Sequence, residues 1–259
     1  MWHIDGYDKL TPYGICINGC IDGFSRLLVW LEAYTTNKDP TIISSYFVEA
    51  VKTRKGCPRR IRADMGTENR YIEQMQIFMR GYHTDALAGH KSFIYGRSTG
   101  NQRIEHWWSI LRKQNAQFWI NLFENIRDDG LFDGSFLDKS LIQFCFLNFV
   151  QADLDEVSSI WNTHRIRSSR NQNAPSGRPI LLYSLPELYG ADNQLRRVDM
   201  QAIQCCEEEC VPKGEYPCDV TIFDLCCTIM EESDWDKPSD PYEAATLYAL
   251  LRSSIRADL

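Results

Sequence analysis

The stretch WHIDGYDKLTPYGICINGCIDGFSRLLVWLEAY, residues 2–34, contains three short apolar runs separated by two turn-forming segments, TPYG and GFSR. The runs are WHIDGYD, GICINGCID and LLVWLEAY, and short apolar segments between such turns are typical of β-strands. We therefore predict that three antiparallel strands open the domain and that Asp5 lies on the first of them.

The segments that follow alternate between helical and extended patterns. Residues 40–55 carry apolar side chains at three- and four-residue spacing before a glycine, as an amphipathic helix does. RRIRAD (59–64) predicts a short strand, MGTEN (65–69) a loop and RYIEQMQIFMRG (70–81) a second helix. KSFIYG (91–96) predicts a fifth strand, and a long helical pattern then begins near Ile104 and continues to residue 126.

This order, βββαβαβα, is that of a ribonuclease H-like α/β layout, in which a mixed five-stranded sheet is flanked by helices. The first and fourth strands are central neighbours in that layout, which places Asp5 beside Asp64. The helix after the fifth strand brings Glu105, in its first turn, to the same end of the sheet. We therefore predict that carboxylates from three separate segments converge.

Three converging carboxylates repel one another, and the pKa of at least one rises unless a cation neutralises them. Mg²⁺ prefers oxygen ligands, and two ions about 4 Å apart stabilise both the attacking and the leaving oxygen of a phosphodiester displacement. We therefore predict that Asp5, Asp64 and Glu105 are metal ligands and catalytic residues, that they bind two Mg²⁺ or Mn²⁺ ions, and that the reaction is phosphoryl transfer.

Four motifs carry a family resemblance. WHIDGYDKL (2–10) is similar to a first-strand motif with a catalytic Asp, and CIDGFSRLLVW (20–30) to a second strand with an Asp-x-x-Ser-Arg turn. RADMGTEN (62–69) matches an Asp-x-Gly-Ser/Thr-x-Asn/Phe loop, and NQRIEHWWSILR (101–112) resembles an Asn-x-x-Val/Ile-Glu helix that bears the final Glu. Together they resemble the retroviral integrase and DDE transposase superfamily, in particular the integrase core domain of eukaryotic mobile elements and their domesticated relatives.

The resemblance implies 3′-end processing and strand transfer of DNA by in-line attack, with Asp5, Asp64 and Glu105 as the catalytic triad. It also implies DNA as the partner, a homo-oligomer and a nuclear location. WNTHRIRSSRNQNAPSGRPILLY (161–183) resembles the downstream arm of the family, which extends the likeness to about residue 190. The segment after that has no counterpart in the family.

The overall charge argues against simple nucleic-acid binding, since the net charge is −7 and DNA-binding domains usually carry a basic surplus. The charge is unevenly distributed, however. Of the 35 acidic and 28 basic residues, 13 acidic and 4 basic ones lie beyond residue 200. The preceding part therefore has a slight basic surplus, and the acidity belongs to the tail.

We divide the chain into a catalytic core (residues 1–127), a helical extension with a basic arm (128–192) and an acidic, cysteine-containing tail (193–259). One or two helices are predicted between about residues 135 and 161.

Six of the ten cysteines lie between residues 205 and 227, without paired Cys-x-x-Cys motifs or a nearby histidine. We expect reduced thiols there rather than a zinc site. No apolar run approaches the length of a membrane helix, so we expect no membrane partner.

Several basic side chains are candidates for contact with DNA phosphates. Three lie on the predicted helix that carries Glu105, namely Arg103, Arg112 and Lys113. Four more lie on the basic arm, where they either follow DNA or bind the acidic surface of the domain itself: Arg165, Arg167, Arg170 and Arg178. A dense basic run over residues 52–62 is more typical of a solvated face.

Other residues near the motifs have structural interpretations. We expect Asp22 to organise a turn, His3 to be packed or hydrogen-bonded, and the aromatic residues after Glu105 to be core. The leading function is a metal-dependent integrase or transposase. The alternatives are a domesticated, catalytically inactive DNA- or protein-binding module that retains the fold, and a ribonuclease H-like nuclease without strand transfer.

Overall fold

The computed structural model describes residues 1–96, 100–167 and 175–257, and its centre is a five-stranded mixed sheet in the order β3-β2-β1-β5-β6. β1 (Trp2–Tyr7), β2 (Cys16–Asp22) and β3 (Leu28–Tyr34) form an antiparallel meander. β5 (Ile61–Ala63) joins β1 in parallel, and β6 (Phe93–Tyr95) joins β5 in parallel. The predicted meander and the predicted pairing of the first strand with the strand that ends at Asp64 are therefore confirmed.

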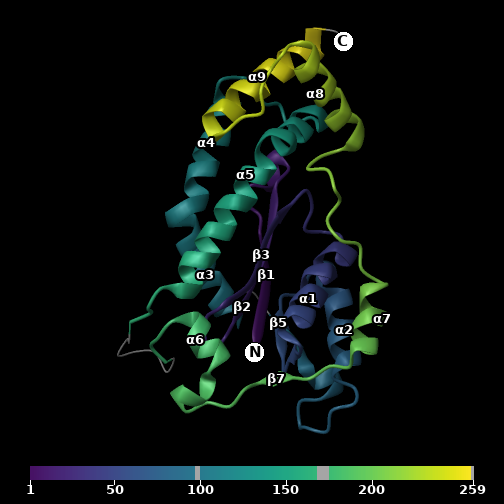
Figure 1. Cartoon of the computed structure of the whole chain (residues 1–259), viewed down its shortest axis with the longest axis vertical. Coiled ribbons are helices and arrows are strands. Elements are labelled where there is room, and N and C mark those ends of the chain that lie inside the picture. The colour runs from purple at the N-terminus through teal and green to yellow at the C-terminus, as the bar shows by residue number, and fades with distance from the viewer. Residues whose placement is uncertain (97–99, 168–174, 258–259) are drawn as a thin grey trace.

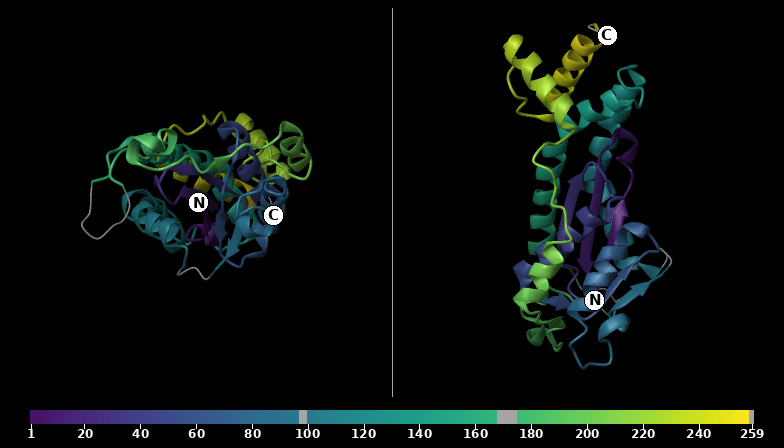
Figure 2. Two further views of the ribbon diagram at one scale, coloured as in Figure 1. Left: turned by 90° about the horizontal axis from the view of Figure 1, so that it is seen from below. Right: turned by 90° about the vertical axis from the view of Figure 1, so that its right-hand side faces the viewer.

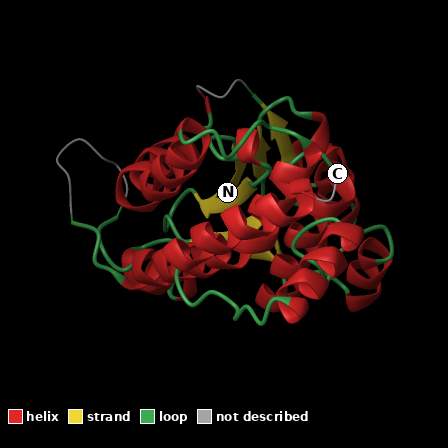
Figure 3. Cartoon of the chain, turned by 90° about the horizontal axis from the view of Figure 1, so that it is seen from above, coloured by secondary structure: helices red, strands yellow, loops and turns green. Residues whose placement is uncertain are grey.

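Helices cover both faces of the sheet (Figures 1 and 3). α1 (Pro40–Arg54) and α2 (Arg70–Met79) pack on the face formed by alternate residues such as Trp2 and Ile4. α3 (Gln102–Leu111), α4 (Gln117–Asp128) and α5 (Phe136–Thr163) pack on the opposite face. Successive strand residues point to opposite sides, which produces two apolar cores separated by the sheet. This α/β architecture is the ribonuclease H-like fold predicted from the sequence.

The predicted long helix after β6 is confirmed, with one irregularity. α3 and α4 are joined by a π-helical segment, Arg112–Ala116, so the helical course is continuous from residue 102 to residue 128. π-helical turns are rare and frequently occur at functional sites. A single helix, α5, occupies the region where one or two were expected, and the Ser135 hydroxyl caps it by accepting a hydrogen bond from the amide of Asp138.

The carboxyl-terminal third contacts both cores. α6 (Pro179–Ser184) follows the basic arm, and α7 (Met200–Glu207) packs on α1 and α2 through buried Ile203 and Cys206. α8 (Val220–Glu232) and α9 (Pro241–Ala257) pack on α5 at the end of the molecule far from the amino terminus (Figures 1 and 2). The proposed division at residues 127 and 192 stays a prediction. In the described part of the chain, no helix has the length and apolar character to cross a membrane.

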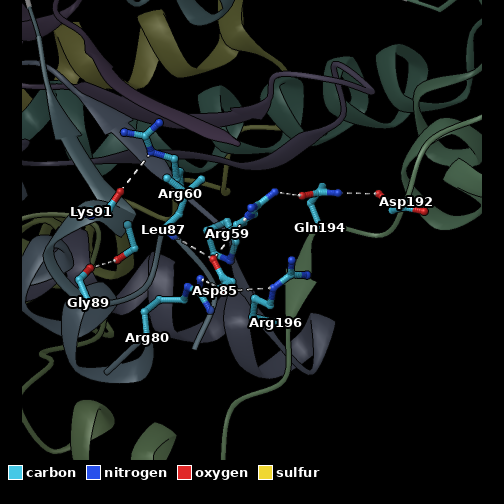
Figure 4. Close-up of polar contacts among 12 residues, drawn as sticks. Arg59, Arg60, Arg80, Asp85, Leu87, Gly89, Lys91, Asp192, Gln194 and Arg196 are labelled. Carbon is cyan, nitrogen blue, oxygen red and sulfur yellow. Dashed lines mark hydrogen bonds and ion pairs between the residues drawn. The ribbon is translucent and has the colours of Figure 1, made fainter. Parts of the chain in front are cut away.

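The segment between α6 and α7 is fastened by an ion-pair cluster around Asp85 (Figure 4). Its carboxylate lies 2.5 Å from Nη2 of Arg80, whose side chain is fully buried, and 3.5 Å from Nε of both Arg59 and Arg196. The hydrogen bond from Arg80 is the main reason that the pKa of Asp85 lies well below its usual range. Arg196 belongs to β7 (Leu195–Arg196), which pairs with β4 (Cys57–Pro58). The cluster therefore joins the residues that follow α2 and β4 to β7.

Candidate active site

Asp5, Asp64 and Glu105 are placed by three elements that meet on one side of the sheet. Asp5 lies within β1, opposite Gly19 of β2, and Asp64 directly follows β5, the parallel neighbour of β1. Glu105 lies in the first turn of α3, as predicted. The charges of Glu105 and Asp64 both act to raise the pKa of Asp5.

The start of α3 is pinned to β1 by Asn101. Its Nδ2 donates to the carbonyl of Ile4 at 2.9 Å, and its Oδ1 lies 2.8 Å from Nδ1 of His3. Burial is the main cause that lowers the pKa of His3 to about 4, although its bond to Asn101 acts in the opposite direction. His3 is therefore the buried, hydrogen-bonded residue that was expected. These contacts fix the end of the helix that presents Glu105.

Asp5 is held by a second contact with α3. The indole Nε1 of Trp108 donates to Oδ2 of Asp5 at 2.9 Å. Glu105 and Trp108 are three residues apart, so they share one side of the helix. Trp108 is buried, as the expected core role requires, but it also orients a candidate metal ligand. In the sequence, only the three-residue spacing between Glu105 and Trp108 indicates that Trp108 could orient Asp5.

Asp64 is oriented by its own loop. Its Oδ1 accepts hydrogen bonds from the amide of Gly66 and from Nδ2 of Asn69, each at 3.2 Å. Asn69 also donates to Glu68 at 3.1 Å, while its buried Oδ1 has no partner among the described residues. The motif Asp-x-Gly-Thr-x-Asn thus forms a rigid turn in which the glycine and the asparagine support the aspartate.

Asp5 and Asp64 line one open cleft of about 860 Å³, together with two carboxylates that the sequence analysis did not single out, Asp8 and Glu68. Burial raises the pKa of Glu68, and the charges of Asp64 and Asp8 add to that effect. Both residues follow a motif aspartate by three or four positions, which is the only sequence signal for them. The cleft therefore has four carboxylates among its described lining residues, and Glu105 is not one of them.

The surroundings of Asp5 shift the pKa of its carboxyl group strongly. Burial raises its pKa to about 7; the Trp108 hydrogen bond opposes this shift, and the charges of Glu105 and Asp64 reinforce it. At neutral pH a substantial fraction of Asp5 therefore carries a proton in the absence of cations. A divalent cation that bound these carboxylates would displace that proton and relieve the repulsion.

The donor set has the chemistry of an Mg²⁺ or Mn²⁺ site, since all three candidate ligands supply carboxylate oxygens. The side chains are not arranged as a closed metal cage, however. Across residues 1–96, 100–167 and 175–257, no three His, Cys, Asp or Glu side chains are grouped closely enough to hold one ion. All ten cysteines are unpaired thiols. The metal-ligand role of the triad stays a prediction.

The predicted turn role of Asp22 is confirmed. Its Oδ2 accepts hydrogen bonds from the amides of Phe24 and Ser25, at 3.1 and 2.8 Å, and from the Ser25 hydroxyl at 2.8 Å. These bonds close the turn between β2 and β3. Asp22 is therefore occupied by local structure and is no additional member of the triad.

The candidate DNA-binding residues are divided between the two sides of α3. Arg112 follows Glu105 by seven positions, about two turns, and so lies on the Glu105 side with the exposed Lys113 nearby. Arg103 faces the other side, where it lines a second cleft with Arg167. Arg165 is exposed and is absent from the described lining of that cleft. Arg170 lies outside the described residues.

A pH titration of stability tests the environment of Asp5. In metal-free protein, the free energy of unfolding is expected to fall by about 2 kcal/mol as the pH rises from about 4 to about 7, because only folded Asp5 holds a proton in that window. Solvent screening keeps this value below that of a fully shielded group. Urea unfolding across the pH range measures the slope.

Two substitutions provide the comparison. Asp5→Asn removes the titrating group and should flatten this part of the profile. Trp108→Phe removes the hydrogen bond that lowers the pKa of Asp5 and should move the window to higher pH. The same slope in the wild type and in the Asp5→Asn variant would show that Asp5 does not titrate in this environment.

A protein-family model described as "Integrase core domain" matches residues 1–180, which is more than half of the chain. No curated protein matches the chain, and no solved structure matches it. The matched region contains β1, β5 and α3 and therefore all three candidate carboxylates. The fold agrees with this match, because the mixed sheet and its flanking helices are those of a ribonuclease H-like integrase core. The chain belongs to the integrase core domain family.

Proposed function

We propose that this protein is a DNA integrase or transposase-like polynucleotidyl transferase that cleaves DNA and joins its ends in a reaction dependent on divalent metal. The observation that carries the proposal is that Asp5 and Asp64 line one cleft, while the helix that bears Glu105 in its first turn is bonded to Asp5 through Trp108. The charges of Asp64 and Glu105 both act on Asp5. A cluster of repelling carboxylates beside an open cleft is costly unless it binds cations.

Asp5, Asp64 and Glu105 would hold Mg²⁺ or Mn²⁺, and we propose two ions. When bound, such ions neutralise phosphate charge and stabilise both the attacking and the leaving oxygen of an in-line displacement. Neighbouring residues of the protein orient the carboxylates. Trp108 holds one carboxylate oxygen of Asp5 and leaves the other available, while Gly66 and Asn69 fix Asp64 in its loop.

We propose that Arg112 and Lys113 contact DNA phosphates. Both lie on the π-helical segment that continues the Glu105 helix, and both are exposed. Arginine and lysine side chains in such positions fix the register of a nucleic-acid backbone. We propose DNA as the substrate, and a homo-oligomer and a nuclear location as expected for an enzyme that joins chromosomal DNA.

A domesticated, inactive DNA- or protein-binding module is the second candidate. The open arrangement of the carboxylates favours it, because no three candidate ligand side chains among the described residues are grouped around a single ion position. Such a module would keep the fold and the basic surfaces without needing catalysis. The two candidates differ in whether DNA is chemically changed.

An assay of DNA cleavage and joining tests the proposal. Purified protein is incubated with labelled duplexes whose ends carry randomised sequence and with plasmid DNA as target, in Mg²⁺, Mn²⁺ or EDTA. The proposal predicts nicked and joined products in either metal and none in EDTA. Cleavage without joined products would instead identify a nuclease. DNA binding with no product in any condition would support the inactive module.

A further inference from the structure

A second open cleft, of about 990 Å³, lies between the start of α3, the turn after β2 and the end of α5. Its cationic and imidazole side chains come from all three of these elements and from β1. They are Arg26, Arg103, Arg167, His3, His106 and His164. Among the described residues that line the cleft, there is neither an aspartate nor a glutamate. In a chain of net charge −7, this cleft is a local basic surface.

Arg26 is the buried arginine of this group. Only 9% of its surface is exposed, its Nη2 donates to the carbonyl of Pro175, and its buried Nε has no hydrogen-bond partner among the described residues. Burial lowers the pKa of Arg26, and the nearby charge of Arg103 lowers it further. A buried guanidinium with an unused donor beside a second arginine is unfavourable unless an anion binds there.

The floor of the cleft is rigid. The indole Nε1 of Trp161 donates to the backbone carbonyl of Arg26 at 2.7 Å, which holds the β2–β3 turn against α5. The Trp161 ring also packs on Trp107 of α3 and on His164, with ring centroids 4.5 and 4.7 Å apart. Arg26, with a φ of 64°, is thus held in an uncommon backbone conformation. A site with such fixed walls needs little rearrangement to bind a ligand.

The cleft is separate from the candidate active site. Residues on a helix advance by about 100° each, so Arg103 lies about 200° around the helix from Glu105. Glu105 faces the carboxylate side, whereas Arg103 and His106 face the basic cleft. Met1 also lines the cleft, and the acidic helix α8 lies with α9 at the other end of the molecule (Figures 1 and 2).

We infer that this basic cleft binds the phosphodiester backbone of a DNA strand, with Arg103 and Arg167 at its mouth and Arg26 at its floor. Arginine suits this role because its planar guanidinium donates paired hydrogen bonds to phosphate oxygens. The inference rests on the proposed function for the identity of the ligand as DNA. It adds a second contact with the DNA, across α3 from the carboxylates, that would hold a strand during the reaction.

DNA binding as a function of salt tests the cleft. The variant Arg103→Gln/Arg167→Gln removes two charges from half-buried and exposed positions, so it should fold, whereas buried Arg26 is left in place. The control variant, Lys91→Gln/Lys237→Gln, removes two charges at exposed positions outside the cleft. Binding of a fluorescent DNA duplex is measured in EDTA over a series of KCl concentrations, with circular dichroism to verify folding.

The cleft variant is expected to bind at least about tenfold more weakly at low salt, with a slope of log K against log[KCl] that is shallower by about 2. The control should keep the wild-type slope. If the cleft variant also keeps that slope, the inference is wrong, and the cleavage assay still decides the proposed function. If the cleft variant loses binding but the wild type neither cleaves nor joins DNA, the cleft is supported and the enzymatic proposal fails.

Discussion

Replacing Asp64 with asparagine is expected to lower the rate of DNA cleavage and joining by about 1000-fold or more. The change removes the charge of one predicted metal ligand, and losing several kcal/mol of transition-state stabilisation corresponds to a rate factor of that size. The fold should persist, because an amide oxygen can still accept the bonds that Gly66 and Asn69 donate to Asp64. Single-turnover assays in Mg²⁺ and Mn²⁺ measure the rate.

The matched control is Asp236→Asn, which makes the same chemical change at an exposed position in the loop between α8 and α9. It should keep the wild-type rate, since it lies outside both clefts. A rate for the Asp64→Asn variant within a few fold of the control would show that Asp64 is no metal ligand. The proposed mechanism would then be wrong, whatever the DNA-binding results.

Replacing Arg252 with methionine is expected to lower the stability of the protein strongly, because Arg252 pairs with a buried carboxylate. Asp138 of α5 is fully buried, and Arg252 of α9 donates to both of its oxygens, at 2.9 and 3.2 Å. Arg256 still reaches Oδ1 of Asp138 at 3.2 Å, so the loss of Arg252 leaves the buried charge only partly compensated. The expected cost is about 3 kcal/mol, at the lower end for breaking a buried ion pair. The melting temperature should fall by about 6–12 °C for a chain of this size.

Arg127→Met is the control for this prediction. Arg127 pairs with Asp128 at 3.1 Å, but both side chains are more than half exposed, so the pair contributes little to stability. Thermal and urea unfolding of both variants measure the difference. Equal stability of the two variants would contradict the view that α9 is held to α5 by a buried ion pair.

The succession of strands and helices and the identity of the candidate carboxylates could be predicted because each depends on local sequence motifs. Turn residues and apolar alternation define β1, β2 and β3, and the loop motif after β5 marks Asp64. The position of Asp5 beside β5 then follows from the layout of the fold. The first-turn position of Glu105 follows from the start of the helical pattern.

The contacts that hold the site could not be predicted, because they depend on how far helices rotate and slide against the sheet. The sequence assigned Trp108 to the core by its apolar periodicity, which gives no information on the direction of its N–H group. Its bond to Asp5 requires the packing of α3 on β1. The π-helical segment also shifts every later side chain, so the orientation of α4 does not follow from an ideal helix.

Which basic residues lie together in the folded protein could not be predicted from the sequence either. Arg103 was placed with Arg112 because both lie near Glu105, but they occupy opposite sides of the helical course, and Arg103 instead meets Arg26 and Arg167 from distant segments. The acidic tail resembles no segment of the family, so its position in the fold could not be predicted. Its docking on α5 involves buried apolar residues and the pairing of Asp138 with Arg252, which are more than a hundred positions apart.

The central claim, that the three carboxylates form a divalent-metal site, is tested most directly by titrating Mg²⁺ and Mn²⁺ into the wild type and the Asp64→Asn variant while following the melting temperature. A ligand that binds only the folded protein raises this temperature as its concentration exceeds its dissociation constant. The melting temperature of the wild type should rise with the concentration of either ion, and that of the variant should not. An equal response of the two proteins, or no response of the wild type to either ion, would show that these carboxylates do not form a divalent-metal site.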